Sequence, residues 1–485
     1  MRIVYAALIA LLSWLLAGCQ PAEPRRAADF RSDQELRVAT RLDAISYRSD
    51  GAGNVSGFEH DLLRKLGERL GVPVRFTIYP DAAAVLDAIV RGEAHIAAAG
   101  LGRNERLPLI WSAPLRDVDY VLVGRGDTII ERESELAGRT VSVRRGSLAA
   151  DFLETLRKRV PGLKLEFPVN AADQRMLEQL AQGRLDLVAT DRLHYAIAAL
   201  TAPDIGIAFD LPFRSEIAWA MPPEARAHLA KEVDAFIAEA RESELLARIA
   251  DRYFGHVRRL DERDINTFLA RIQARLPKYR AHFHEAQAAT GVDWRFIAAL
   301  AYQESHWDPL ATSWSGVRGM MMLTSETADR LGVQDRLDAR ASILGGARYF
   351  TMLRDLLPDE VPEPDRSWMA TAAYNLGMGH LNGARQIAQR IGQDNTSWLD
   401  MKAVLPLMSR PEYAARLKAG AARGGEAVIM AENVRNYHDI LMRLEAPYTP
   451  PLLPKGLRLG GRERGAAEPG TGIVSLSAPA ARSRP

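Results

Sequence analysis

The sequence predicts a two-domain protein, in which an α/β domain with two lobes precedes an all-α domain. From residue 36 to about residue 255, short apolar runs alternate with helical stretches, which is typical of parallel strands covered by helices. From residue 276 the strand signal disappears and only helical patterns remain. The 485 residues leave room for both domains, because one domain commonly takes roughly 150 residues.

The composition excludes several classes of protein. The chain is 47% hydrophobic and 26% charged, which are ordinary values for a globular protein. Its 63 basic and 61 acidic residues give a net charge of +2, so we expect no nucleic-acid partner held by bulk charge. The single cysteine excludes an intramolecular disulfide and any multi-cysteine metal site. We expect neither a cofactor nor a bound metal.

The N-terminus has the pattern of an export signal. Arg2 precedes the apolar run Ile3–Leu16, which is shorter than the roughly 20 residues of a membrane-spanning helix. The run ends in Leu-Ala-Gly-Cys19, which resembles the lipoprotein box of bacterial lipoproteins. The resemblance implies a signal peptide over 1–18 and a lipid on Cys19, which anchors the chain to a membrane. Gln20 in place of Asp is compatible with sorting to the outer membrane, on its periplasmic face. The alternative is an ordinary signal with an incidental cysteine.

Residues 19–35 are polar and predict a tether, and residues 36–255 predict the α/β domain. Strand patterns cover 36–40, 74–79, 95–99, 140–143, 163–167 and 185–189. Helical patterns cover 58–70, 82–91, 148–159, 172–182 and 192–200. The rhythm implies a mainly parallel sheet in each of two lobes, with a ligand site between them at the carboxyl ends of the strands.

Several segments of this domain, in this order, resemble the family 3 extracellular solute-binding proteins. They are Gly57–Asp61, Gly92–Gly100, Arg103–Arg106, Trp111–Pro114, Leu136–Gly138, Gly146–Ser147 and Ile249–Gly255. The resemblance implies a periplasmic-binding-protein-like fold that captures amino acids. It also implies that Arg106 pairs with a ligand carboxylate, that the backbone near Ser147 assists, and that Asp191 holds a ligand ammonium.

Other interpretations of these ligand residues stay open. Arg103 replaces the family's usual threonine, which leaves room for a peptide or muropeptide ligand in place of a free amino acid. Arg106 could be a surface arginine of a charged loop, and Asp191 could be a helix N-cap before Arg192. Fusion to the second domain favours a regulatory role for the first.

The second domain follows a charged helical linker over 256–275 and extends over 276–448. Its predicted helices cover 278–290, 294–305, 324–331, 339–356, 367–376, 379–389 and 427–444. The Pro- and Gly-rich residues 449–485 predict a disordered tail. A domain of this length can bury a core of its own.

The helix over 294–305 carries the most informative acid of the chain. Asp293 is a candidate N-cap, and Ile297, Leu300 and Ala301 share one face that Glu304 continues. A carboxyl against an apolar wall, near the negative end of a helix, keeps its proton more readily. Such a carboxyl can act as a general acid near neutral pH. A frayed, solvated last turn is the alternative.

Three motifs in order resemble the soluble lytic transglycosylases, whose fold is similar to goose-type lysozyme. They are Glu304–Ser305, Ser315–Leu323 and Ala372–Gly377, and Glu432–Tyr437 is a further match. The combination with a solute-binding domain resembles the membrane-bound members of this group. The resemblance implies cleavage of the β-1,4 bond between N-acetylmuramic acid and N-acetylglucosamine in peptidoglycan, giving 1,6-anhydromuramic ends without water.

The resemblance also assigns roles to individual residues. Glu304 protonates the leaving oxygen and then takes the proton of the C6 hydroxyl, Ser305 orients the N-acetyl group, Tyr374 stabilises charge near the acid, and Asn375 holds backbone or sugar. The substrate-binding residues are Gly316, Gly319, Met322, where glutamine is usual, and Tyr437, for which a structural role is nearly as plausible.

Two other functions stay open. A second catalytic carboxylate would make the enzyme a hydrolytic muramidase. The acids nearest in sequence are Asp293, Asp308 and Glu326, and Pro309 suggests a turn at Asp308. The helical domain could also hold peptidoglycan without cleaving it.

Overall fold

The structure, a computed structural model, describes residues 30–449 except 50–54, 170–171, 258, 314–315, 416 and 418–419. The described residues up to Tyr448 belong to one compact unit. The predicted signal peptide 1–18, Cys19, most of the predicted tether and the predicted tail from residue 450 lie outside the described residues. The end of the predicted tether contains the short helix α2 (Phe30–Asp33), whose Phe30 is buried.

The first lobe is built on a five-stranded sheet in the order β4-β1-β5-β12-β6. Its strands are β1 (Leu36–Thr40), β4 (Val74–Ile78), β5 (Ile96–Ala97), β6 (Ile110–Trp111) and β12 (Ala220–Met221), beside the small hairpin of β2 (Arg48–Ser49) and β3 (Val55–Ser56). Its helices are α3 (Phe58–Leu70), α4 (Ala82–Val90), α8 (Leu229–Glu242) and α9 (Leu245–Phe254). Strand β1 pairs in parallel with β4 and β5, as predicted.

The second lobe has a sheet in the order β11-β7-β10-β8-β9. Its strands are β7 (Arg116–Arg125), β8 (Thr140–Val143), β9 (Lys164–Glu166), β10 (Leu187–Asp191) and β11 (Ile205–Ile217). Its helices are α5 (Leu148–Arg157), α6 (Asp173–Ala181) and α7 (Arg192–Ala199). Strand β8 pairs in parallel with both β9 and β10.

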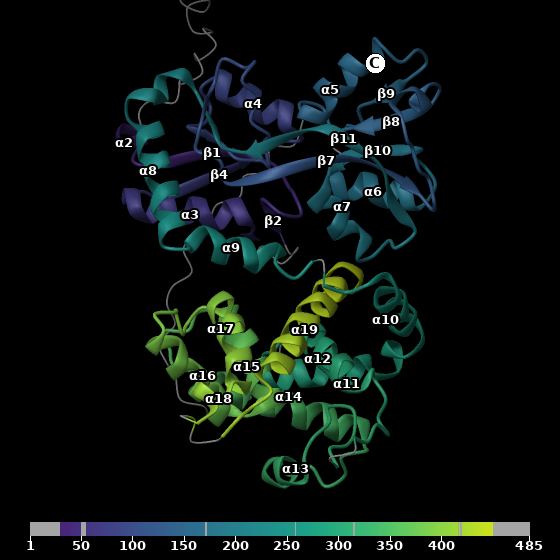
Figure 1. Cartoon of the computed structure of the whole chain (residues 1–485), viewed down its shortest axis with the longest axis vertical. Coiled ribbons are helices and arrows are strands. Elements are labelled where there is room, and N and C mark those ends of the chain that lie inside the picture. The colour runs from purple at the N-terminus through teal and green to yellow at the C-terminus, as the bar shows by residue number, and fades with distance from the viewer. Residues whose placement is uncertain are drawn as a thin grey trace, which may run out of the picture. The chain divides into compact units, whose positions relative to one another are not determined.

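The expectation of a mainly parallel sheet is wrong, because each sheet is mixed. Strands β7 and β11 pair antiparallel with each other along most of their length, and β7 pairs antiparallel with β10. In the first lobe, β12 pairs antiparallel with β5 and β6. Figure 1 shows β7 and β11 as long strands that run from one sheet toward the other. These two strands connect the lobes.

Side-chain caps fix where several helices of the two lobes begin. Asp81 accepts a hydrogen bond from Ala84 N at the start of α4, and Ser147 accepts one from Ala150 N at the start of α5. Asp191 ends β10 and caps α7. Such caps satisfy backbone N–H groups that the first helical turn leaves without partners.

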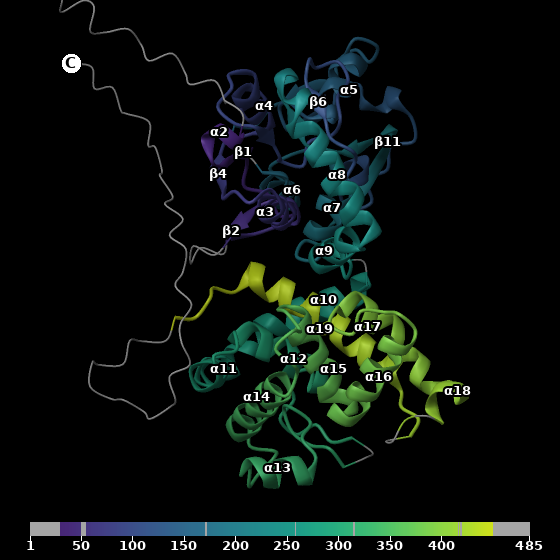
Figure 2. The same cartoon turned by 90° about the vertical axis from the view of Figure 1, so that its left-hand side faces the viewer.

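The all-α domain packs around the buried helix α12. Its elements are α10 (Glu262–Ala274), α11 (Leu276–Thr290), α12 (Trp294–Ser305), α13 (Ser325–Leu331), α14 (Ala339–Asp355), α15 (Asp365–Leu376), α16 (Met378–Arg390), α17 (Trp398–Val404), α18 (Pro411–Ala414) and α19 (Gly424–Leu444). Every side chain from Trp294 to Tyr302 is buried, and Asp293 caps the helix as predicted. Helices α12 and α15 both pack against α19, and all three lie together in both views (Figures 1 and 2).

The segment predicted as a linker contributes to the core of this domain. Its helix α10 buries Phe268 completely. The Phe268 ring centroid lies 4.4 Å from that of Tyr302, 5.5 Å from that of Trp307 and 4.6 Å from that of Tyr437. Such aromatic contacts stabilise a core beyond the area they bury.

Polar contacts connect α9 to α19. Arg435 is 2% exposed, and its guanidinium donates a hydrogen bond of 2.7 Å to the carbonyl oxygen of Asp251. The Asp251 carboxylate lies 3.3 Å from the same guanidinium. Shortly after α9, His256 Nε2 lies 2.8 Å from Asp439, and the Asn436 amide donates 2.9 Å to the His256 carbonyl. The last helix of the domain is therefore tied to residues 251–256.

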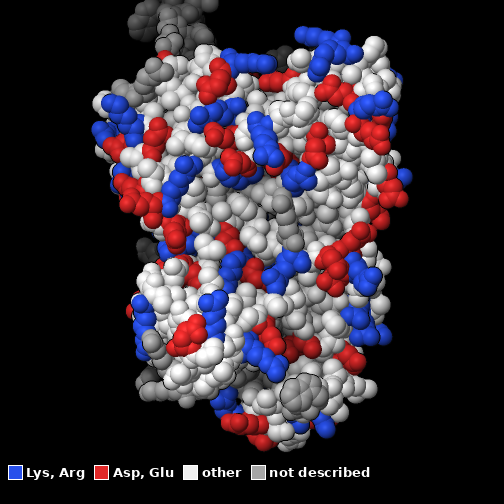
Figure 3. Space-filling model, in the orientation of Figure 1, with Lys and Arg blue, Asp and Glu red and all other residues white. Residues whose placement is uncertain are grey.

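Charges of both signs intermingle over the face shown in Figure 3. This arrangement agrees with the near-zero net charge of the sequence. Among the described helices, none combines the length and the apolar character that a bilayer crossing requires.

Candidate active site

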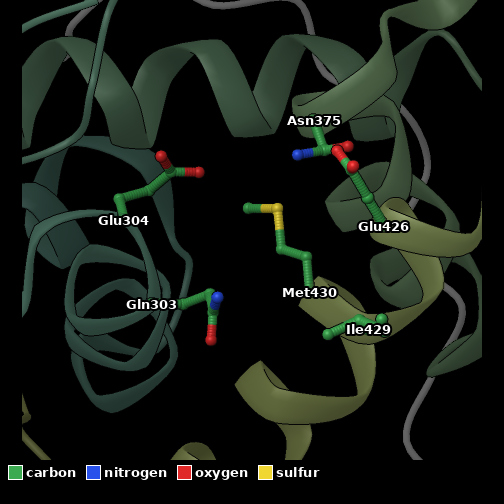
Figure 4. A pocket seen from close by; sticks show the side chains of 6 residues that line it. All are labelled: Gln303, Glu304, Asn375, Glu426, Ile429 and Met430. Carbon is green, nitrogen blue, oxygen red and sulfur yellow. The ribbon is translucent and has the colours of Figure 1, made fainter. Parts of the chain in front are cut away.

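A cavity of about 280 Å³ opens between α12, α15 and α19. It is lined by Gln303, Glu304, Asn375, Glu426, Ile429 and Met430. In Figure 4 the Glu304 carboxyl points into this space, and Asn375 and Glu426 lie on the opposite side. The Met430 side chain extends between them in this view. The Glu304 carboxyl therefore shares the cavity with amide, carboxylate and apolar side chains.

Burial controls the protonation of Glu304. Desolvation raises the pKa of this carboxyl to about 8, and it is the only cause of the shift. No cation and no hydrogen-bond donor among the described residues pairs with the carboxyl. A neutral carboxylic acid at physiological pH can donate a proton to a bound substrate. Glu304 is thus desolvated, although Gln303, Asn375 and Glu426 make part of the cavity lining polar.

Two hydroxyl groups hold the loop that follows α12. Ser305 is buried, and its Oγ lies 2.8 Å from the Met320 carbonyl oxygen and 3.1 Å from that of Ala301. The Tyr374 hydroxyl donates a hydrogen bond of 2.8 Å to the Met321 carbonyl oxygen. Burial and the nearby Glu304 raise the pKa of Tyr374 well above its ordinary value, so the phenol keeps its proton. The two residues therefore position the loop backbone beside the acid.

The same loop contains strained and close-packed backbone. Gly316 and Gly319 have φ values of 82° and 85°, and Met322 has a φ of 47°, which is uncommon for a residue with a side chain. A Cβ on Gly319 would lie 1.7 Å from the Arg336 carbonyl oxygen. Among the described residues, nothing lies within 4 Å of a Cβ on Gly316. Gly319 therefore serves the packing of the loop.

We expect Tyr374→Phe to lower activity about tenfold and stability by about 1 kcal/mol, because the Met321 carbonyl loses its donor. Release of soluble fragments from purified peptidoglycan, the substrate that the sequence resemblance implies, measures the first effect, and urea denaturation measures the second. Tyr349→Phe is the matched control, since its ring lies 5.1 Å from that of Tyr374. An equal loss of activity in both variants would contradict the special role of the Tyr374 hydroxyl.

The structure brings only some of the predicted site residues together. Glu304 and Asn375 line the cavity, and Ser305 and Tyr374 lie behind it through the loop. Met322 is half-buried and does not line the cavity. Tyr437 is buried in the aromatic cluster of Phe268 and Tyr302, also outside the lining.

Four lining residues were not predicted. Gln303 precedes the acid, and Glu426, Ile429 and Met430 come from the first turns of α19. The spacing of the last three, i, i+3 and i+4, places them on one face of a helix. The helix was predicted to begin at residue 427, so Glu426 was left outside it. Ile429 and Met430 lie inside the predicted helix, but a local pattern does not reveal that this helix packs against α12.

The predicted ligand residues of the first domain lie in different environments. Arg106 is exposed in the loop between β5 and β6. Ser147 caps α5 with its own hydroxyl. Asp191 is buried, caps α7, and lies 2.8 Å from His194 and 3.5 Å from Arg116. Of the three, only Asp191 belongs to a buried charged cluster.

Comparison with known sequences matches both domains. The profile of the transglycosylase SLT domain matches residues 281–396. The profile of bacterial extracellular solute-binding proteins, family 3, matches residues 36–256. A solved structure of the P235GK mutant of ArgBP from T. maritima is 20% identical with a TM-score of 0.43, and the match covers 47% of this chain and 97% of that one.

Curated relatives match almost the whole chain. A membrane-bound lytic murein transglycosylase F from Thiobacillus denitrificans is 41% identical over 473 residues, which is 96% of this chain and 97% of the relative. One of the same name from Methylobacillus flagellatus is 41% identical over 448 residues, covering 91% and 95%. With the order of the two domains and the half-buried acid of α12, these matches show that the chain belongs to the membrane-bound lytic murein transglycosylase F family.

Proposed function

We propose that this protein cleaves the β-1,4 bond between N-acetylmuramic acid and N-acetylglucosamine in peptidoglycan and forms 1,6-anhydromuramic ends. The observation that carries the proposal is Glu304, an unpaired carboxyl in a cavity with a pKa of about 8. Ordinary glycosidases use two carboxyl groups. A lytic transglycosylase uses one group as acid and then as base, and Glu304 suits both steps.

The reaction starts with Glu304 protonated. Its proton passes to the glycosidic oxygen as the bond to C1 of the muramic residue breaks, and the carbonyl oxygen of the substrate's own N-acetyl group stabilises C1. The C6 hydroxyl oxygen then bonds to C1, and its proton returns to the Glu304 carboxylate. Asn375, on the opposite side of the cavity, holds the sugar by hydrogen bonds. Ser305 and Tyr374 position the acid and the loop.

Glu426 favours a second candidate function, hydrolysis. It is a carboxylate of the same cavity, and its side chain is 59% exposed and lies 3.3 Å from Arg423. A second carboxylate that activates water would give reducing muramic ends. The acids Asp308 and Glu326 do not line the cavity, and Asp293 is held by Arg295.

Product analysis separates the two reactions. We expect the wild type to release mainly anhydromuramic ends from purified sacculi, and we expect Glu426→Gln to leave their share of the products unchanged. Mass spectrometry distinguishes the two kinds of end. Reducing ends that disappear in Glu426→Gln would instead establish hydrolysis. A chain that only binds peptidoglycan would release no soluble fragments.

The first domain binds an amino acid, a peptide or a muropeptide, and its occupancy regulates cleavage. The match to family 3 solute-binding proteins supports this role, as does fusion to a second domain that matches the transglycosylase SLT profile. Calorimetry with amino acids, stem peptides and purified muropeptides tests the assignment. Absence of binding by all three classes would contradict it.

Cys19 carries a lipid that anchors the protein to the periplasmic face of the outer membrane. The Leu-Ala-Gly-Cys sequence supports the lipidation, and Gln20 supports the outer-membrane destination. The curated relatives are named as membrane-bound. Mass spectrometry of the mature protein should find acyl groups on Cys19. An unmodified Cys19 in the mature chain would overturn the anchor.

A further inference from the structure

A buried charged cluster occupies the place where a ligand of the first domain is expected. Arg41 and Asp43 follow β1 of the first lobe, whereas Asp173 begins α6 and His194 lies on α7 of the second lobe. All four residues are at most 5% exposed. In open α/β sheets, ligands bind beyond the carboxyl ends of the strands, which is where this cluster lies.

Two contacts of the cluster cross from one lobe to the other. Arg41 Nη2 lies 3.4 Å from Asp173 Oδ2, and Asp43 Oδ2 lies 2.9 Å from His194 Nε2. Both crossing contacts join opposite charges. Burial alone would lower the pKa of His194. The carboxylates of Asp191 and Asp43 nevertheless raise this pKa well above its ordinary value, so the imidazole is charged at neutral pH.

Contacts within each lobe hold the crossing groups in place. Arg41 also lies 2.5 Å from Asp43, and its Nε donates to the Ala99 carbonyl. On the other side, Asp173 lies 2.6 Å from Arg144 and accepts a hydrogen bond from the Thr190 hydroxyl at 2.8 Å. Each crossing group is therefore preorganised by a partner of its own lobe.

The cluster is charge-paired without any added ion. Asp43, Asp173 and His194 offer ligand atoms within 4.8 Å of one another. The Arg41 guanidinium, however, already contacts both carboxylates, and Arg144 contacts one of them. The protein thus supplies its own cation at this position.

We propose that Arg41, Asp43, Asp173 and His194 form an ionic latch that holds the two lobes of the first domain closed without a ligand. Separation of the lobes would break both crossing ion pairs and leave each group only the partner of its own lobe, so the two crossing contacts favour the closed form. A ligand that enters between the lobes must therefore replace the crossing contacts of the latch. This behaviour differs from that of a binding domain that stays open until its ligand arrives, and it does not depend on the catalytic assignment.

Distances between spin labels on the two lobes test the latch. The full chain carries Cys19→Ser, Glu68→Cys on α3 and Lys158→Cys after α5, at exposed positions. Electron paramagnetic resonance then measures the distance distribution without ligand. We expect one narrow distribution for the otherwise native chain, and broader distributions at longer distances for Arg41→Met and Asp43→Asn.

The matched control is Arg139→Met, which removes an Arg139–Asp186 ion pair of 2.7 Å inside the second lobe. It should leave the distribution narrow. A broad, long distribution in the otherwise native chain would overturn the latch, as would unchanged distributions in Arg41→Met and Asp43→Asn. Circular dichroism checks that the variants are folded, and if they are not, the distribution of the otherwise native chain alone decides.

Discussion

Glu304→Gln should abolish the release of soluble fragments from purified peptidoglycan, with a loss of at least about 10³-fold. The amide has the size of the carboxyl but can neither give its proton to the leaving oxygen nor take one back from the C6 hydroxyl. General acid or base catalysis alone is commonly worth about 10²–10⁴-fold, and in the proposed mechanism one group performs both steps. Digestion of sacculi, followed by chromatography of the soluble products, measures the loss.

Glu326→Gln is the matched control for this substitution. Glu326 is an exposed acid on α13 and does not line the cavity. Its variant should digest sacculi at the wild-type rate. Substantial activity in Glu304→Gln, with a normal circular dichroism spectrum, would show that another group is the acid.

The pH dependence of stability gives an independent check on Glu304. Burial raises its pKa from the ordinary 4.5 to about 8, so between these pH values the folded protein holds a proton that the unfolded chain has lost. Stability therefore falls as pH rises from 4.5 to 8, and Glu304→Gln removes this loss. At pH 7 we expect the variant to be more stable by about 2–3 kcal/mol.

Urea denaturation at pH 4 and at pH 7 measures this difference. At pH 4 the Glu304 carboxyl is neutral in both states, so the wild type and Glu304→Gln should be equally stable. The activity of the wild type should also decline above pH 8, because the acid form is lost. A stability difference that does not change between the two pH values would contradict the raised pKa.

Gly319→Ala should strongly disrupt the all-α domain. Its Cβ would lie 1.7 Å from the Arg336 carbonyl oxygen, and the φ of 85° is unfavourable for alanine. The backbone cannot yield easily, because Gly319 N donates to the Ala311 carbonyl at 2.9 Å. We expect a loss of more than about 3 kcal/mol, from overpacking and backbone strain together.

Gly316→Ala separates strain from overpacking. Its φ of 82° is nearly the same, but its Cβ would meet nothing within 4 Å. We expect a loss of about 1–2 kcal/mol, from the backbone alone. Thermal unfolding followed by circular dichroism compares the two variants. Equal losses would mean that the Arg336 carbonyl moves aside at little cost.

Local patterns predicted most helices and the parallel strands. The bounds of α3 and α12 agree with the prediction, because each has an apolar face and a clear start or stop, such as Gly71 after α3 and Asp293 before α12. Strands β7 and β11 were missed, although Tyr120–Val123 is a buried run. Their antiparallel pairing joins residues nearly a hundred positions apart, which a local pattern does not reveal.

The candidate acid could be predicted, but most of its cavity could not. Glu304 and Asn375 stood in recognisable motifs. Glu426 was missed because the start of α19 at Gly424 has no side-chain cap to mark it, and Met430 because the packing of α19 against α12 is long-range. The charged cluster around Asp191 could not be predicted either, because Asp43 contacts His194 from 151 positions away in the sequence.

The contacts of Arg435 and Asp439 affect the stability of the C-terminal half when it is expressed separately. A fragment that starts after residue 256, where the match to the solute-binding profile ends, lacks both Asp251 and His256. In such a fragment Arg435 would lose its contact with Asp251, and Asp439 would lose its contact with His256. Each lost partner would cost about 1–3 kcal/mol of stability. A fragment that starts before Leu245 retains these partners and should be the more soluble of the two.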